Sequence, residues 1–221
     1  MAAPTAEFPA RLVTVGGQAR MASGASGVGE VQVMPDLLHA FTMAICRSDG
    51  SSAEEARLVA DHLVLANLFG HDSHGVGMMP AYIQNTTTGH CVRNHHAKIV
   101  RDNGAVIVID GGAGYGQVIA KEAMDIGVER AKKHGVAVVG LKNSHHIGRV
   151  GHWAEQCARA GLVSTHWVNV GRRQPGSEGG DADGVAFLRS RRRAILADDP
   201  RTSSRAHDRN RLPHPPYGRR A

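Results

Sequence analysis

Long hydrophobic runs are absent from this sequence of 221 residues. No apolar stretch approaches the roughly 18 residues that span a bilayer. The N-terminus also lacks the basic start and apolar segment of a secretory signal peptide. The sequence therefore predicts no membrane span and no signal peptide. The hydrophobic content of 42% is sufficient for a folded core and excludes a wholly disordered chain.

Cysteine is scarce and irregularly spaced. The three cysteines, Cys46, Cys91 and Cys157, lie far apart and form no C-x-x-C pair. An odd number at such spacing argues against both a disulfide framework and a zinc ribbon. It favours a protein of the reducing cytoplasm.

Lysine is absent from residues 171–221, which hold 12 Arg and 6 acidic residues. Residues 1–170 hold 14 basic and 14 acidic residues, so the whole net charge of +6 belongs to the later segment. Because the charges of residues 1–170 cancel, this part of the chain does not require nucleic acid as a partner. Arg-rich, Lys-free sequence is what GC-rich DNA gives in a wrong frame. We therefore hypothesise that residues 171–221 are an irregular tail read out of frame, and that the protein is truncated near Val170.

Three further segments differ in composition and in hydrophobic periodicity. Residues 1–33 are rich in Gly, Ala and Ser and aperiodic, which predicts a flexible leader. Residues 34–96 show helical periodicity and predict an N-terminal helical segment. In it, Ser51 and Ser52 precede two glutamates by three residues each, a doubled capping-box pattern. Residues 97–170 alternate strand and helix patterns and predict a partial α/β segment.

Within residues 97–170, β-branched runs predict strands and longer amphipathic stretches predict helices. The expected strands are Ala97–Val100, Ala105–Ile109, Val136–Leu141 and Leu162–Val168, and the expected helices are Val118–Lys133 and Arg149–Ala160. Gly135 stands where a C-cap is expected. The predicted fold class is therefore α/β, with helices in front and an incomplete C-terminus.

Fourteen histidines are many for this length, and several gather in two loops. The first loop runs from Gly70 to Gly75 and contains Ser73 and His74. The second runs from Asn143 to Gly148 and contains His145 and His146. Ligands collect at strand carboxyl ends and helix N-termini in open α/β sheets, and imidazole exchanges protons near neutral pH. Ser, Asn and His are also common as caps and surface residues in turns, so both interpretations stand.

The two loops read GHDSHG and NSHHIG, with a D-G-x-x-x-x-G-Q segment between them. Over about residues 34–170 the sequence resembles the malate/L-lactate dehydrogenase family, whose fold is not of the Rossmann type. The turn from Gly111 to Gln117 is consistent with a fold that is not of the Rossmann type, because its sequence does not satisfy the dinucleotide-binding pattern G-x-G-x-x-G. Gly112 and Gly114 are therefore expected to form a tight turn, not a pyrophosphate cradle.

The resemblance implies hydride transfer between NAD or NADP and a small 2-hydroxy acid or 2-oxo acid, in a homodimer. It also implies that residues 34–96 form the substrate side and residues 97–170 the cofactor side. The implied residue roles are His74 and His146 as catalytic residues and Ser73 at the substrate. The implied cofactor-binding residues are Asn143, Gly148 and Gly151.

Two features depart from the family pattern. Family members usually place an arginine shortly after S-H-G, where this chain has Met78, Met79 and Ala81. Family members are also longer, and a chain that lacks their later part is hypothesised to be inactive. The choice between malate, lactate and other 2-hydroxy acids stays open.

Two alternatives come from other functional classes. The first is a metal-dependent hydrolase, whose candidate ligands are His71, His74, His145 and His146. Their spacing does not match H-E-x-x-H, and no metal site is predicted. The second is a nucleic-acid binder that acts through the Arg-rich tail.

Overall fold

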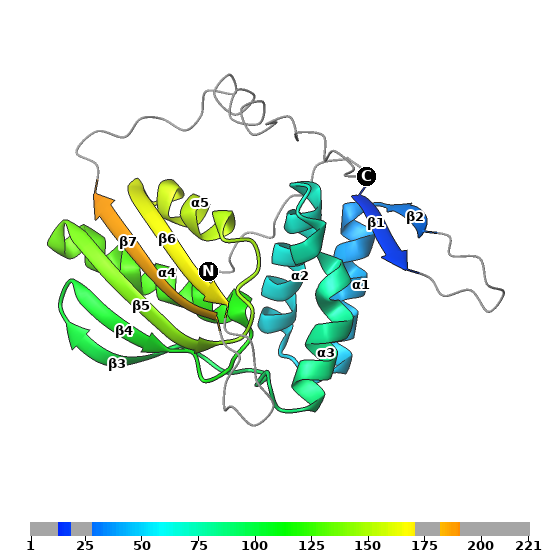
Figure 1. The fold of residues 1–221 in the computed structure, drawn as a ribbon, viewed down its shortest axis with the longest axis horizontal. Coiled ribbons are helices and arrows are strands. Elements are labelled where there is room, and N and C mark those ends of the chain that lie inside the picture. The colour runs from blue at the N-terminus through cyan, green and yellow to red at the C-terminus, as the bar shows by residue number, and fades with distance from the viewer. Residues whose placement is uncertain (1–12, 19–27, 171–181, 191–221) are drawn as a thin grey trace, which may run out of the picture. The chain divides into compact units, whose positions relative to one another are not determined.

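Figure 1 shows the computed structural model of the chain, which describes residues 13–18, 28–170 and 182–190. In this portion, three α-helices precede a five-stranded sheet and its two helices. The α/β class with a helical segment in front is therefore confirmed.

The helical part consists of α1 (Pro35–Ser48), α2 (Ala53–Leu68) and α3 (Met79–Thr87). The predicted capping pattern is confirmed at Ser52, whose side chain accepts a hydrogen bond from the Glu55 backbone N–H at 3.1 Å. These helices and the start of α4 (Gly116–His134) share one core. Its largest fully buried side chains include those of Leu63, Tyr82 and Tyr115. The helical part is thereby packed against the start of α4, the helix that connects two parallel strands of the sheet.

Two strands lie within the segment expected to be a flexible leader. β1 (Val13–Gln18) pairs antiparallel with β2 (Val28–Val33), and Val13 is buried in the core of the helical part. Small residues obscured these strands in the sequence, because glycines interrupt their alternation. Residues 1–12 and 19–27 of the expected leader lie outside the described residues.

The sheet has the order β3-β4-β5-β7-β6. β4 and β5 are parallel, and the other neighbouring strands pair antiparallel. The strands are β3 (Lys98–Asn103), β4 (Val106–Asp110), β5 (Val136–Ser144), β6 (Leu162–Val170) and β7 (Ala182–Ser190).

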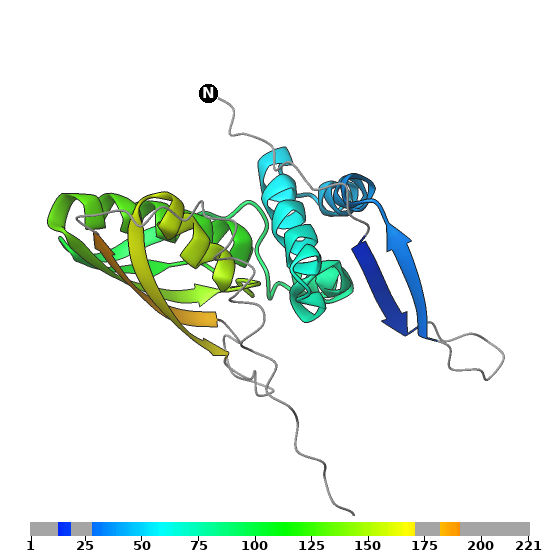
Figure 2. The same ribbon diagram turned by 90° about the horizontal axis from the view of Figure 1, so that it is seen from above.

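Helices α4 and α5 (Gly151–Arg159) cover one face of the sheet, as Figure 2 shows. Alternate residues of the strands point into this layer, including Ile107, Val139 and Leu188, which are almost fully buried. Gly135 ends α4 in the left-handed region with φ of 79°, which confirms the predicted C-cap.

Strand β7 corrects the expectation of an irregular tail. It lies between β5 and β6, and Ala186 and Leu188 are buried under the helices. The strand was missed because Arg-rich and Gly-rich sequence surrounds its short apolar run. The rest of the expected tail, residues 171–181 and 191–221, lies outside the described residues. The hypothesis that this tail is read out of frame therefore stays a prediction for those residues.

Candidate active site

The first histidine loop follows α2 and is tied to it by Asn67. The Asn67 side chain donates to Asp72 Oδ1 at 2.6 Å and accepts from the Val76 backbone N–H at 2.8 Å. Gly75 lies so close to the Asn67 amide that a Cβ at this position would overlap it. The loop is thus held in one shape by a single side chain of the preceding helix.

Within this loop, Ser73 is exposed and His74 is half-buried. Ser73 Oγ and His74 Nδ1 are 2.8 Å apart, at hydrogen-bond distance. His71 is exposed, and its Nδ1 lies 3.2 Å from the Phe69 carbonyl oxygen. The two histidines of one loop therefore have different surroundings.

The second loop begins with the last two residues of β5, Asn143 and Ser144. Asn143 has a φ of 53°, and its side chain donates to Asp110 Oδ1 at 2.9 Å. Its carbonyl oxygen accepts from the Ala113 backbone N–H at 2.8 Å, which joins the loop to the glycine-rich turn. Gly112 and Gly114 form that turn as expected: Gly112 has a φ of 53°, and the Gly114 N–H donates to the Gly111 carbonyl.

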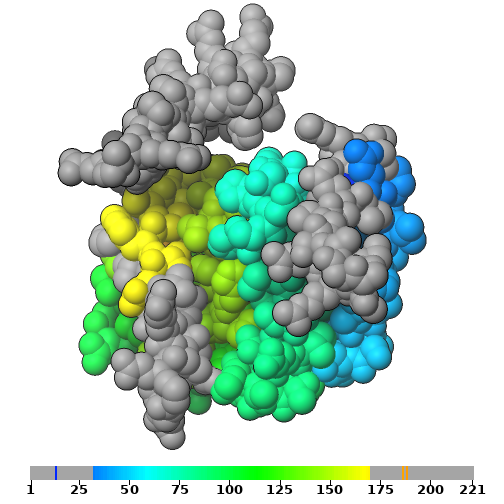
Figure 3. Space-filling model, turned by 45° about the vertical axis from the view of Figure 1, so that its right-hand side comes forward, coloured from blue at the N-terminus to red at the C-terminus, as the bar shows by residue number. Residues whose placement is uncertain are grey.

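The two loops converge. The ring centroids of His74 and His146 are 5.2 Å apart, although the residues come from different parts of the fold. In Figure 3, the cyan atoms of the α2–α3 region lie directly beside the green and yellow-green atoms of the α/β part. A carbonyl oxygen bound at the edges of the two rings could be contacted by both imidazoles.

Tyr82 of α3 holds His146 in place. Its hydroxyl lies 2.7 Å from His146 Nδ1, and the Gln117 side-chain N–H donates to the same hydroxyl at 2.8 Å. Because Gln117 donates to the Tyr82 oxygen, the Tyr82 proton is available for His146 Nδ1. This arrangement places the proton of neutral His146 on Nε2. Sequence reasoning gave neither residue a role, since Tyr82 lies in a helical pattern and Gln117 is noted only as the last residue of the glycine-rich turn.

Burial lowers the pKa of His146 to about 4, and nearby His74 contributes further to the shift. His146 is therefore neutral at pH 7. Burial also lowers the pKa of His145 to about 4, and its Nε2 lies 2.9 Å from the Asn85 side-chain nitrogen. His145 is 6% exposed and faces the helical core.

The buried histidines predict a pH-dependent stability. His145, His146 and His152 each have a pKa near 4, below the ordinary value of 6.5. Between these two values the unfolded chain binds protons that the folded chain does not. We expect the free energy of unfolding to fall as the pH is lowered from about 6.5 to 4. These three histidines contribute a slope of about three protons, and His62 and His166, whose pKa values burial also lowers, add to it. Urea unfolding at several pH values measures this, and His145→Gln should reduce the slope by about one proton. A flat profile over this window would contradict these pKa values.

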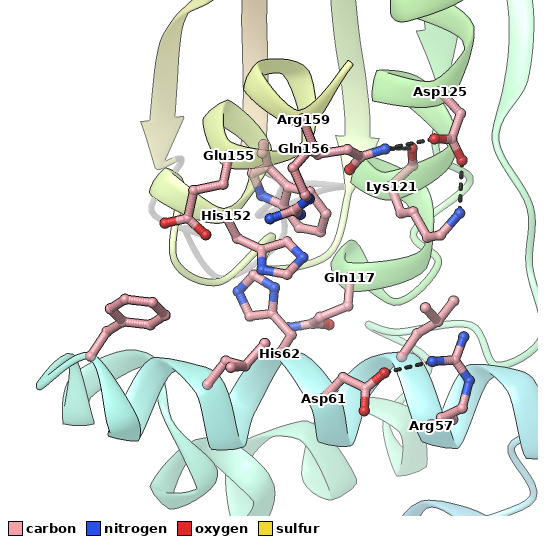
Figure 4. Close-up of a pocket in the computed structure, with 14 residues that line it drawn as sticks. Arg57, Asp61, His62, Gln117, Lys121, Asp125, His152, Glu155, Gln156 and Arg159 are labelled. Atoms are coloured by element: carbon pink, nitrogen blue, oxygen red, sulfur yellow. Dashed lines mark hydrogen bonds and ion pairs between the residues drawn. The ribbon is translucent and has the colours of Figure 1, made fainter. Parts of the chain in front are cut away.

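A groove lies between α2, α4 and α5, with a volume of about 560 Å³. We call it the α2–α5 groove; Figure 4 shows His62 from α2, Gln117 from α4 and His152 from α5 pointing toward one another within it. Its walls include the apolar side chains of Leu58, Leu65 and Trp153. Gln117 links this groove to the second histidine loop, because it lines the groove and donates to Tyr82, which contacts His146.

The residues expected at the cofactor lie at the junction of the second loop and α5. Gly148 has a φ of 70°, and a Cβ there would overlap the His62 ring. The Arg149 backbone N–H donates to His62 Nε2 at 2.8 Å. Gly151 is the first residue of α5, while Asn143 lies on the side of the glycine-rich turn. The geometry brings Gly148 to the α2–α5 groove through its contact with His62.

The two alternatives gain no support from the described residues. Among them no group of three or more His, Cys, Asp or Glu side chains is arranged to hold a metal ion. The basis of the nucleic-acid alternative lies in residues 171–221, which are mostly outside the described portion. The three cysteines are unpaired and buried. None of the described helices is long and apolar enough to cross a membrane.

Comparison with known proteins gives consistent results. The sequence model described as malate/L-lactate dehydrogenase matches residues 33–182. Hydroxycarboxylate dehydrogenase B of Escherichia coli O157:H7 is 58% identical over 133 residues, which are 60% of this chain and 37% of that protein. L-Lactate dehydrogenase of Cupriavidus necator is 41% identical over 124 residues, 56% of this chain and 35% of that protein.

A similar fold is found in a solved structure. Malate dehydrogenase from Pyrococcus horikoshii OT3 superposes with a TM-score of 0.62 at 31% identity, over 68% of this chain and 43% of that one. The chain thus spans less than half the length of each of these proteins. The predicted non-Rossmann fold is confirmed by this likeness.

Proposed function

Since the chain belongs to the malate/L-lactate dehydrogenase family, we propose that it interconverts a 2-oxo acid and a 2-hydroxy acid with a nicotinamide cofactor. The observation that carries this proposal is the convergence of His74 and His146, whose ring centroids are 5.2 Å apart. Reduction of a carbonyl needs a proton donor and a hydrogen-bond donor at the oxygen on which negative charge develops. Two adjacent imidazoles can supply both.

His146 acts as the hydrogen-bond donor in this proposal. Its pKa near 4 keeps the ring neutral at pH 7, and the Tyr82 hydroxyl at Nδ1 leaves Nε2–H free to donate to the substrate carbonyl. A buried donor fixed by Tyr82 and Gln117 needs no reorganisation as charge grows on that oxygen.

His74 acts as the proton carrier. It is half-buried and stands at the end of an exposed loop, so it can exchange protons with solvent. Its imidazolium gives its proton to the carbonyl oxygen as the carbonyl carbon receives a hydride, and the product is a 2-hydroxy acid. Ser73, 2.8 Å from His74 Nδ1, orients the ring at the substrate. In the reverse direction neutral His74 accepts the hydroxyl proton.

The cofactor, when bound, supplies or accepts the hydride. The α2–α5 groove fits such a molecule, because its volume of about 560 Å³ is typical of ligand sites and it contains two buried polar atoms without partners among the described residues, His62 Nδ1 and Gln117 Oε1. Gly148 lies against His62, which lines the groove, and Gly151 begins α5, which forms one of its walls; Asn143 is bonded to Asp110 beside the glycine-rich turn. Either NAD or NADP is compatible with these groups.

The proposal is tested by cofactor oxidation. The 221-residue chain, and any longer product that the gene encodes in another frame, are mixed with NADH or NADPH and a panel of 2-oxo acids including pyruvate and oxaloacetate. We expect loss of absorbance at 340 nm that depends on the 2-oxo acid, with one acid and one cofactor preferred. Lack of oxidation in every combination by every product would contradict the proposed function.

We further propose a homodimer in the cytoplasm. The three buried free thiols are compatible with a reducing compartment. On the sheet face opposite the helices, Val106, Val136 and Trp167 are exposed, which supports association with another surface. Sedimentation equilibrium should give twice the chain mass, whereas a monomer at micromolar concentration would contradict this part of the proposal.

A further inference from the structure

His62 presents a buried donor to the α2–α5 groove. The residue is 2% exposed, and its Nε2 accepts a hydrogen bond from the Arg149 backbone N–H at 2.8 Å. Burial lowers its pKa well below the ordinary value, so the ring is neutral and its proton is on Nδ1. Among the described residues Nδ1 has no hydrogen-bond partner. A buried N–H without an acceptor destabilises the protein, and a ligand that supplies an acceptor removes this cost.

Gln117 presents a buried acceptor to the same groove. The residue is 1% exposed, and its side-chain nitrogen is committed to the Tyr82 hydroxyl at 2.8 Å. That bond fixes the orientation of the amide and leaves Oε1 without a partner among the described residues. Figure 4 shows the Gln117 side chain pointing toward His62 across the groove. The groove therefore offers one donor and one acceptor on facing elements.

The surroundings restrict what can occupy the groove. Its inner walls carry Leu58, Leu65 and the rings of His152 and Trp153, which suit a flat, largely apolar group. The groove is lined by equal numbers of basic and acidic residues. Two of the basic side chains already form ion pairs, Arg57 with Asp61 and Lys121 with Asp125. A free carboxylate would lack a proton for Gln117 Oε1 and would meet these acidic side chains.

We propose that the groove binds an aromatic ring bearing a primary carboxamide, whose oxygen accepts from His62 Nδ1 and whose NH₂ donates to Gln117 Oε1. A carboxamide is the simplest planar group that carries an acceptor beside a donor. This inference rests on the proposed function in one respect, because it identifies the ring as the nicotinamide of the cofactor. It assigns His62 and Gln117 as the residues that recognise the carboxamide.

A matched pair of ligands tests the proposal without any substitution in the protein. Nicotinamide mononucleotide and nicotinic acid mononucleotide differ only by a carboxamide in place of a carboxylate. We expect isothermal titration of the 221-residue chain to give a Kd of about 1 mM for the amide, which corresponds to about −4 kcal/mol, and at least tenfold weaker binding for the acid. Equal binding of the two, or no binding of the amide at about 10 mM, would overturn the proposal.

A matched pair of variants identifies the acceptor. Gln117→Leu removes the unpartnered oxygen and should weaken binding of the amide about tenfold while abolishing its preference over the acid. Gln156→Leu is the control, because Gln156 lines the same groove but its amide nitrogen is satisfied by the Lys121 carbonyl and Asp125. Circular dichroism of both variants checks that they fold. Retained preference for the amide in Gln117→Leu would remove Gln117 from recognition and overturn the assignment.

The outcomes also separate this inference from the proposed function. Preference for the amide in a protein that oxidises no cofactor with any 2-oxo acid would support the groove assignment and contradict the dehydrogenase proposal. Oxidation of the cofactor by a protein without that preference would contradict the groove assignment alone.

Discussion

His74→Ala should lower the turnover of 2-oxo acid by about 10²–10⁴-fold, the usual contribution of a positioned proton donor. The imidazole of His74 lies beside that of neutral His146, so its removal leaves the substrate oxygen with a hydrogen-bond donor but without a proton source. The loss should appear in kcat more than in KM, because the proton is transferred only as the reaction proceeds. Steady-state cofactor oxidation at saturating 2-oxo acid measures this effect.

His71→Ala is the matched control. His71 belongs to the same short loop and is exposed, and its ring nitrogen Nδ1 lies 3.2 Å from the Phe69 carbonyl oxygen. We expect turnover within about twofold of the unaltered chain, in line with the small effects of most surface substitutions. Unchanged turnover in His74→Ala would remove this residue from the mechanism, and an equal loss in His71→Ala would indicate that the loop itself is perturbed.

Gly116→Ala should lower the free energy of unfolding by about 3 kcal/mol, at the upper end of the usual cost of overpacking. A Cβ on Gly116 would overlap the backbone oxygens of His145 and His146, and backbone cannot move aside as a flexible side chain can. Relief of this overlap requires α4 and the second histidine loop to separate. Urea unfolding monitored by circular dichroism measures the change.

Gly77→Ala provides the comparison for Gly116→Ala. No atom lies within 4 Å of a Cβ built on Gly77, and its backbone is not in the left-handed region. The free energy of unfolding should change by less than about 0.5 kcal/mol. An equally small change in Gly116→Ala would show that the contact between α4 and the histidine loop is not tight.

Local patterns in the sequence were sufficient for most helix ends and for the two loops. The N-cap at Ser52 and the C-cap at Gly135 were predicted because a single side chain or a missing Cβ determines each. The loops of His74 and His146 were identified by residue type and by their position between elements. Their residue roles remain predictions until the variants are measured.

Other features depend on contacts between distant segments, which no local pattern records. Tyr82 and Gln117 lie in ordinary helical sequence, and only the packing of α3 against α4 makes them partners of His146. The same holds for His62, whose role as a buried donor follows from a bond to Arg149. Strand β7 was missed because its place between β5 and β6 is decided by pairing with both neighbours.

The most direct test of the account asks whether His74 and His146 contact one bound carbonyl compound. Protein labelled with ¹⁵N-histidine is titrated with oxamate, a 2-oxo acid analogue that cannot accept a hydride, and the ring signals are assigned with His74→Ala and His146→Ala. The account predicts that the ring signals of both histidines shift together with a single Kd, and that His146 is protonated on Nε2 throughout. Movement of only one of the two signals, or of neither, would contradict a shared site.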